Sequence, residues 1–184
     1  MKLIDITKEL FSTPPYPDDP IASQRLIRDM KKGFTYNMSE ITLGAHNATH
    51  IDAPLHFIDG GDDVADIDLN KCFGSCRVAE QRFISLSDAE SLCKNTKRLL
   101  LKGKVDISPP AASLLAKHLD LIGTEQLTIG DAMVHKIFLR AGVVILESLD
   151  LSKAPVGSYL LSALPLKMKG VEGSPCRAVS KYRL

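Results

Sequence analysis

Three of the five histidines in this chain lie within one segment of eleven residues, together with an acid. They are His46, His50 and His56, and Asp52 lies between the last two. Imidazole nitrogen and carboxylate oxygen are the donors that zinc and manganese take in hydrolytic sites. A single histidine usually packs in the core or lies at the surface, but packing alone explains such a cluster poorly. The segment therefore predicts a metal site.

The spacing within this segment sets conditions on the backbone. His50 and Asp52 are two residues apart, so in an extended strand both point to the same face. A strand would separate His46 from His50 by roughly 13 Å, too far for one ion with bonds of about 2 Å. The chain must therefore turn through residues 47–49, and Pro54 offers a bend that could return His56 to the site. No glutamate follows His46, which argues against a zincin-type helix.

His135 and Glu147 could form a second half of the site. Asp131 is expected to cap a helix that carries His135 and ends at Gly142. Residues 143–146 are an apolar run, typical of a strand buried on both faces, and Glu147 follows directly. From His135 to Gly142 the helix would run roughly 10 Å, and from Gly142 to Glu147 the strand would run roughly 16 Å in the opposite direction. Both side chains could therefore lie at the same end of the sheet. From the residues alone, a helix-surface histidine and a rim glutamate remain the simpler interpretation.

The elements that position these residues change in kind along the chain. Proline and acid clusters divide the first half into short strands, expected at residues 3–6, 24–30, 34–43 and 76–81. The second half alternates helices with strands, and its first helix is expected to begin at Ser87, with Glu90 completing a capping box, and to end near residue 94. Another helix is expected from Pro109 to about residue 119. The other strands are expected at residues 98–101, 121–123, 143–146, 159–168 and 177–182. This order indicates an α/β or α+β domain with layered sheets.

The bulk properties exclude several classes of protein. A length of 184 residues favours a single domain, residues 1–184, and 45% hydrophobic with 24% charged residues is ordinary for a globular protein. A net charge of +1 gives no reason to expect nucleic acid or an acidic membrane surface as partner. The sequence contains no run of eighteen apolar residues, so no membrane span is predicted. Asp5 interrupts what would be the apolar part of a signal peptide, so we expect a cytoplasmic protein.

The four cysteines do not form a metal motif. Cys72 and Cys76 are one residue too far apart for a CxxC pair, and no second pair completes a zinc knuckle. Free thiols in a reducing compartment are expected, at Cys72, Cys76, Cys93 and Cys176.

The segment from His46 to Phe57, HNATHIDAPLHF, closely resembles the HxGTHxDxPxHF signature of the cyclase-like metal-dependent hydrolases, which include the bacterial kynurenine formamidases. Residues 16–20 resemble the early proline-acid loop of that family, and residues 123–125 resemble its Gly-Thr-Asp element. His135 and Glu147 fall at the spacing of its two later ligands. Most of the chain, residues 3 to about 177, follows the order of the family.

The resemblance implies a swivelling β/β/α domain with layered sheets and flanking helices, and a site for two divalent ions, zinc or alternatively manganese. His46, His50 and Asp52 would hold the first ion. Asp52 would bridge to the second ion, which His135 and Glu147 would complete. The resemblance therefore favours His135 and Glu147 as metal ligands over the simpler interpretation of a surface histidine and a rim glutamate.

The same resemblance implies that His56 is catalytic and not a ligand. The implied reaction is that of an arylformamidase, which converts N-formylkynurenine to kynurenine and formate in tryptophan catabolism. A cyclic amide or a lactone is an alternative substrate, and a non-catalytic metal-binding protein is the rival class. The absence of a Gly-x-Ser-x-Gly elbow argues against a serine esterase. The expected partners are a small amide substrate and further copies of the chain, as a dimer or larger.

Three departures from the family pattern are expected to affect substrate choice more than chemistry. Ala48 replaces a glycine, Glu125 replaces an aspartate, and the segment between Glu125 and His135 is short, in a chain without tryptophan. An aryl substrate needs a flat apolar wall. The candidates for that wall are Phe11, Tyr16, Phe34 and Phe57.

Overall fold

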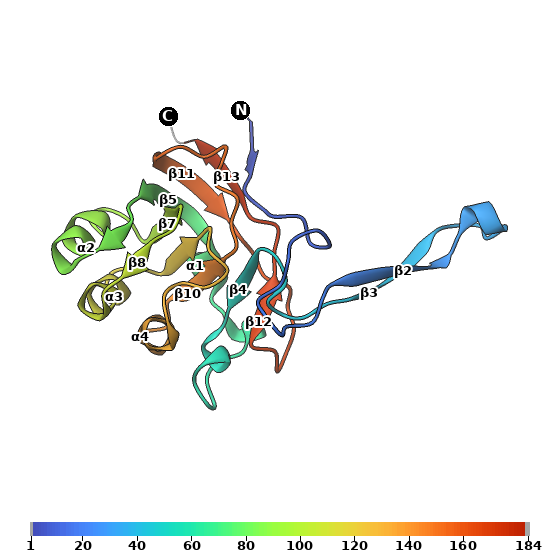
Figure 1. The fold of residues 1–184 in the computed structure, drawn as a ribbon, viewed down its shortest axis with the longest axis horizontal. Helices are drawn as coiled ribbons and strands as arrows, with labels where there is room; N and C mark the ends of the chain where they lie inside the picture. The colour runs from blue at the N-terminus through green and yellow to red at the C-terminus, as the bar shows by residue number, and fades with distance from the viewer. Residues whose placement is uncertain (1, 183–184) are drawn as a thin grey trace.

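The computed structural model describes residues 2–182, which form a large mixed sheet with helices packed on it (Figure 1). The nine strands of this sheet lie in the order β1 (Ile4–Asp5), β13 (Val179–Tyr182), β11 (Gly157–Ser162), β5 (Phe73–Glu80), β7 (Arg98–Lys102), β9 (Leu121–Thr124), β10 (Val144–Glu147), β4 (His50–Asp52) and β12 (Gly173–Pro175). The four strands β5, β7, β9 and β10 are parallel, and the strands outside them pair antiparallel. The α/β class is thus confirmed.

Helices connect the parallel strands. They are α2 (Leu86–Leu92), α3 (Pro109–Ala116) and α4 (Ala132–Arg140), and they lie together beside the sheet in Figure 1. The short α1 (Leu69–Cys72) precedes β5, and β6 (Phe83–Ile84) pairs with β8 (Asp106–Ile107). Parallel strands need such crossover connections, because a tight turn places the next strand antiparallel to the one before it.

The sheet carries an apolar core on each face. Leu99, Leu101 and Ile122 pack with the three helices, whereas Leu100 and Leu121 pack on the other face. Neighbouring residues of a strand point to opposite faces, so these continuous apolar runs serve both cores. Burial on both faces fixes the level at which β9 and β10 end, and therefore where the residues after them lie.

The structure corrects several predicted boundaries. Ser85, not Ser87, is the N-cap of α2, and its capping box is completed by Asp88, not Glu90. Both serines precede an acid by three residues, so the pattern alone could not choose between them. The helix α3 ends at Ala116, before the expected residue 119. The predicted strand 34–43 is limited to β3 (Met38–Thr42), because residues 34–37 turn after a 3-10 helix, η1 (Met30–Lys32).

A two-stranded arm formed by β2 (Ser23–Arg28) and β3 projects far from the rest of the molecule (Figure 1). Every residue of both strands is exposed. The apolar side chains on this arm include Leu26, which is 48% exposed, and Ile41, which is 54% exposed. An isolated hairpin is marginally stable at best in water, so this arm lacks the cover that stabilises the other strands.

No helix within residues 2–182 is long and apolar enough to span a membrane. All four cysteines are free thiols, as expected. Burial raises the pKa of Cys72, Cys76 and Cys176 to about 12. These three thiols therefore remain protonated near neutral pH, and a thiol, unlike a thiolate, is a poor nucleophile.

We predict that only Cys93 reacts rapidly with an aromatic disulfide reagent at pH 8 in the native protein. Cys93 is partly exposed, whereas burial raises the pKa of the other three thiols and keeps them protonated. A spectrophotometric thiol count should give one fast group natively and four in denaturant. Two or more fast groups in the native protein would contradict the packing described above.

Candidate active site

The first half of the site lies on β4 and the turn before it. His50 and Asp52 point the same way, and His50 Nε2 lies 3.3 Å from Asp52 Oδ1. His50 Nδ1 lies 2.8 Å from the carbonyl oxygen of Ala48, so the ring donates there and leaves Nε2 free to act as a ligand. The turn brings His46 back, with Nδ1 at 2.9 Å from Asp52 Oδ1. The turn required by the spacing is confirmed.

A strained backbone makes this turn. Ala48 has a φ of 54°, in the left-handed region that residues with a Cβ rarely adopt. This conformation accounts for the glycine at the matching position of the family signature. Ser148 has the same φ, and its carbonyl accepts a 2.6 Å hydrogen bond from Thr49 Oγ1. The two strained residues are thus held by a bond between their segments, a pattern common at functional sites.

The second half of the site comes from α4 and β10. Asp131 caps the helix as predicted, and its carbonyl oxygen lies 3.2 Å from His135 Nδ1. His135 Nε2 lies 3.1 Å from Glu147 Oε1, which also accepts a 2.7 Å hydrogen bond from the Ile129 amide. Both His135 and Glu147 are buried, so the interpretation as a helix-surface histidine and a rim acid is wrong.

Strand pairing joins the two halves. The antiparallel ladder of β10 and β4 places Glu147 opposite His50. His50 Nε2 lies 3.6 Å from Glu147 Oε2, and His135 Nε2 lies 3.8 Å from Asp52 Oδ2. The sequence did not predict this pairing, because β4 has three residues and its partner lies nearly a hundred residues further along the chain.

Asp52 belongs to both halves. Two sets of three side chains each offer ligand atoms within 4.8 Å of one another: His46 with His50 and Asp52, and Asp52 with His135 and Glu147. Asp52 is completely buried, and its Oδ2 has no hydrogen-bond partner among the described residues. An orphaned, buried carboxylate oxygen is costly unless a cation satisfies it. The donor types and this orphaned atom fit divalent metal ions.

Opposite charges stabilise the cluster electrostatically. Burial favours the neutral form of His50, but hydrogen bonds to Asp52 and Glu147 outweigh it and raise its pKa to about 10. Burial likewise opposes charge on His135, yet Glu147 raises the pKa of that ring. Hydrogen bonds from His46 and His50 hold the pKa of Asp52 well below its usual range against the effect of burial. Metal ions would have to displace the imidazole protons, so their binding should strengthen as pH rises.

His56 lies beside the cluster. The 3-10 turn η2 (Pro54–His56) returns it, as the proline suggested, and its ring centroid lies 4.1 Å from that of His46. It belongs to neither set of potential ligands among the described residues. Burial lowers the pKa of His56, and the neighbouring His46 and His135 lower it further against the pull of Asp52. The ring is therefore neutral near pH 7 and can accept a proton.

A cavity of about 590 Å³ opens over these groups. Tyr16 and Phe57 contribute to its wall, whereas Phe11 and Phe34 do not. Asp19 of the proline-acid loop lines it as well, and so do Pro14 and Pro15, which precede that loop. Sequence reasoning missed Leu127, Thr128, Ala132 and Ser148, which lie in the loops after β9 and β10 or at the start of α4 and carry no motif.

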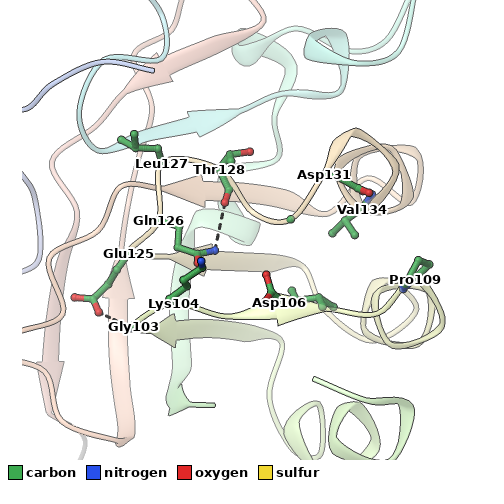
Figure 2. Close-up of a pocket in the computed structure, with 12 residues that line it drawn as sticks. Gly103, Lys104, Asp106, Pro109, Glu125, Gln126, Leu127, Thr128, Asp131 and Val134 are labelled. Atoms are coloured by element: carbon green, nitrogen blue, oxygen red, sulfur yellow. Dashed lines mark hydrogen bonds between the residues drawn. The ribbon is translucent and has the colours of Figure 1, made fainter. Parts of the chain in front are cut away.

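Glu125 faces away from this cavity. It lines a neighbouring cavity of about 820 Å³ (Figure 2), and both cavities are lined in part by the loop that carries Leu127, Thr128 and Asp131. Its carboxylate accepts hydrogen bonds from the amides of Gly103 and Leu151, at 2.6 and 2.7 Å. Glu125, at the position where the family has an aspartate, therefore binds backbone amides. It does not line the candidate site, so the structure gives no support to the expectation that this residue affects substrate choice.

Comparison with known proteins identifies the class. A structure titled "The Structure Of Potential Metal-Dependent Hydrolase With Cyclase Activity" superposes with a TM-score of 0.84 at 28% identity, covering 100% of this chain and 98% of the other. Isatin hydrolase A from Labrenzia aggregata gives a TM-score of 0.84 at 20% identity, covering 98% and 93%, and shares the fold. Fold and donor cluster together define a metal-dependent hydrolase.

Sequence comparison identifies the family. Residues 4–100 match the family model described as "Putative cyclase". The kynurenine formamidase of Geobacillus thermodenitrificans is 32% identical over 198 residues, covering 95% of each chain. That of Polaromonas naphthalenivorans is 33% identical, covering 89% of this chain and 83% of its own. The chain belongs to the cyclase family.

We predict that Asp52→Asn removes most of the metal from the purified protein, because the substitution removes the charge that both sets of ligands share. Elemental analysis after purification in excess zinc measures the content per chain. The control is Asp19→Asn, at the mouth of the cavity and outside both sets. Unchanged content in Asp52→Asn would rule out a shared ligand.

We also predict that Ala48→Gly raises the free energy of unfolding by about 0.5–1 kcal/mol, because relief of left-handed strain, worth about 1–2 kcal/mol, exceeds the added chain entropy. Ala48→Val should be destabilising, since a β-branched residue is a poorer fit to this conformation. Urea unfolding of the metal-free variants measures both. A glycine variant less stable than the parent would mean that the buried methyl group contributes more than the strain costs.

Proposed function

We propose that this protein is an arylformamidase-type amidohydrolase that converts an aryl formamide, such as N-formylkynurenine, to the amine and formate. The observation that carries the proposal is the fully buried Asp52 shared by two ligand sets, with a neutral histidine beside them at the floor of a partly aromatic cavity. The curated relatives named kynurenine formamidase, at 32% and 33% identity over most of the chain, support the substrate class.

The five proposed ligands form two sets that share Asp52. His46, His50 and Asp52 would hold one divalent ion, and Asp52, His135 and Glu147 a second. Such ions, zinc or alternatively manganese, supply Lewis acidity, which acidifies water and polarises a carbonyl group. Hydrogen bonds to Ala48 and Asp131 hold the Nε2 atoms of His50 and His135 toward the centre, so these ligands are oriented before any ion binds.

His56 is the proton-transfer group in this proposal. The neutral ring accepts a proton from the water whose oxygen bonds to the formyl carbon. When the carbon–nitrogen bond breaks, the same ring donates that proton to the departing nitrogen. A histidine whose pKa is lowered by burial is neutral before the first transfer and readily gives up the proton in the second. Phe57 packs edge-on against this ring at 4.6 Å and restricts its orientation.

The cavity wall favours a small, flat substrate. Tyr16 and Phe57 supply aromatic surface, Pro14, Pro15 and Leu127 supply apolar surface, and Asp19 adds an acid near the mouth. An aryl ring gains by burial against such a wall, and a formyl carbon is the least hindered acyl carbon for attack. A cyclic amide or lactone would fit the same chemistry and is the second candidate, but only fold-level likeness to isatin hydrolases supports it.

We predict that His56→Ala retains its metal and loses about 100- to 10,000-fold in kcat, the usual contribution of a general acid–base group. The matched control is His118→Ala, which changes an exposed histidine outside the site and should leave kcat unchanged. Turnover of an aryl formamide and metal content are measured on the same preparations. Loss of metal from His56→Ala would make His56 a ligand instead.

Substrate class is tested with a panel. We expect metal-dependent turnover of aryl formamides, abolished by a chelator and restored by zinc or manganese. If a lactone or cyclic amide is hydrolysed in a metal-dependent manner and formamides are not, the formamidase proposal fails while the metal-hydrolase mechanism stands.

A homodimer built through the β2–β3 arm is also part of this proposal. The register places Leu26 and Ile41 on one face of the hairpin and the Arg25–Glu40 ion pair on the other. Leu26 and Ile41 share that face with Gln24 and Ser39, and exposed apolar side chains on a projecting arm are typical of a protein interface. A reducing compartment, and therefore the cytoplasm, suits the four free thiols.

The double substitution Leu26→Lys with Ile41→Lys should convert the dimer to a monomer, because the partner would have to bury two charges. Arg25→Lys, on the opposite face, is the control and should remain a dimer. Sedimentation at micromolar concentration gives the mass. A parent protein with the mass of one chain would contradict the proposed assembly.

A further inference from the structure

His46 differs from the other two ligand histidines in how its far nitrogen is placed. The Nδ1 atoms of His50 and His135 lie within 3.2 Å of backbone carbonyl oxygens, which fixes their rings. His46 is turned the other way: its Nδ1 faces Asp52, and its Nε2 points away from the cluster. That Nε2 is buried and has no hydrogen-bond partner in the described part of the chain.

A charged side chain, that of Glu172, lies beside this orphaned nitrogen. Its Oε1 lies 3.4 Å from His46 Nε2, and its side chain is 41% exposed while that of His46 is 17% exposed. Glu172 belongs to neither set of potential ligands, and no motif in the sequence marks it. It lies immediately before β12, the edge strand beside β4.

The backbone around Glu172 is fitted to the imidazole. The Glu172 carbonyl oxygen accepts a 2.8 Å hydrogen bond from the Ala53 amide, and Gly173 pairs with Asp52 in the ladder. A Cβ on Gly173 would lie 2.7 Å from Cε1 and 3.0 Å from Nε2 of His46. Only a glycine leaves room for the ring at this point, so the strand holds both the ring and the acid in place.

The geometry points to Glu172 as a positioning residue for the metal centre: its carboxylate accepts the Nε2–H of His46 and fixes the tautomer whose Nδ1 binds metal. Metal-binding histidines characteristically donate their other N–H to a carboxylate or carbonyl group, which orients the ring and makes it a stronger ligand. Two of the three rings use carbonyl groups, and the third uses an acid. This inference rests on the proposed ligation by His46.

The test measures zinc affinity in the metal-free protein by competition with a chromogenic chelator, so it does not depend on any substrate. Glu172→Ala should weaken the tightest binding about 10- to 100-fold, the usual effect of removing such a partner. Glu172→Gln should lose less, because its amide oxygen still accepts the N–H. Glu90→Ala removes an exposed acid far from the site as the control, and thermal unfolding of each metal-free variant checks the fold.

A double-mutant cycle separates positioning from a general effect of charge. In a His46→Ala background, Glu172→Ala should weaken zinc binding no further, because the ring on which it acts is gone. An equal loss in both backgrounds, or no loss in the single variant, would overturn the role of Glu172. If His46→Ala itself leaves zinc affinity unchanged, the ligand assignment fails, and the role of Glu172 fails with it.

Discussion

The burial of one carboxylate, Asp52, between two groups of histidine and acid side chains is the constraint on which the rest of this structure depends. An ionised carboxylate that is fully buried needs compensating positive charge. Protonated imidazoles supply it in the metal-free protein, and divalent ions would supply it more strongly. The antiparallel pairing of β4 with β10 is what brings those groups around a single side chain.

Buried strands hold this cluster in place, and strained backbone beside it lowers the stability locally. The strands that carry Asp52 and Glu147 are buried, and the rings of His50 and His135 are each oriented by a backbone carbonyl oxygen. Ala48 and Ser148 are held in left-handed conformations at the two turns beside the cluster. Strain and buried charge are tolerated here because the two apolar cores of the sheet supply stability elsewhere.

Local patterns in the sequence predicted much of this site. Two-residue spacing placed His50 and Asp52 on one face, and helix and strand rises placed His135 near Glu147. The choice between a buried pair and a surface pair needed the family resemblance, because burial depends on contacts distant in sequence. Glu172 and the loop residues of the cavity could not be predicted, since single residues brought in by an edge strand or a loop carry no periodic signal. The capping box of α2 was misplaced because two serines offered equivalent patterns.

The account is tested most directly by anomalous diffraction from crystals of the protein loaded with zinc, recorded on both sides of the zinc absorption edge. It predicts two peaks, one among His46, His50 and Asp52 and the other among Asp52, His135 and Glu147, with the Asp52 carboxylate between them. A single peak bound by all five side chains, or a peak with Asp52 outside its coordination sphere, would contradict it.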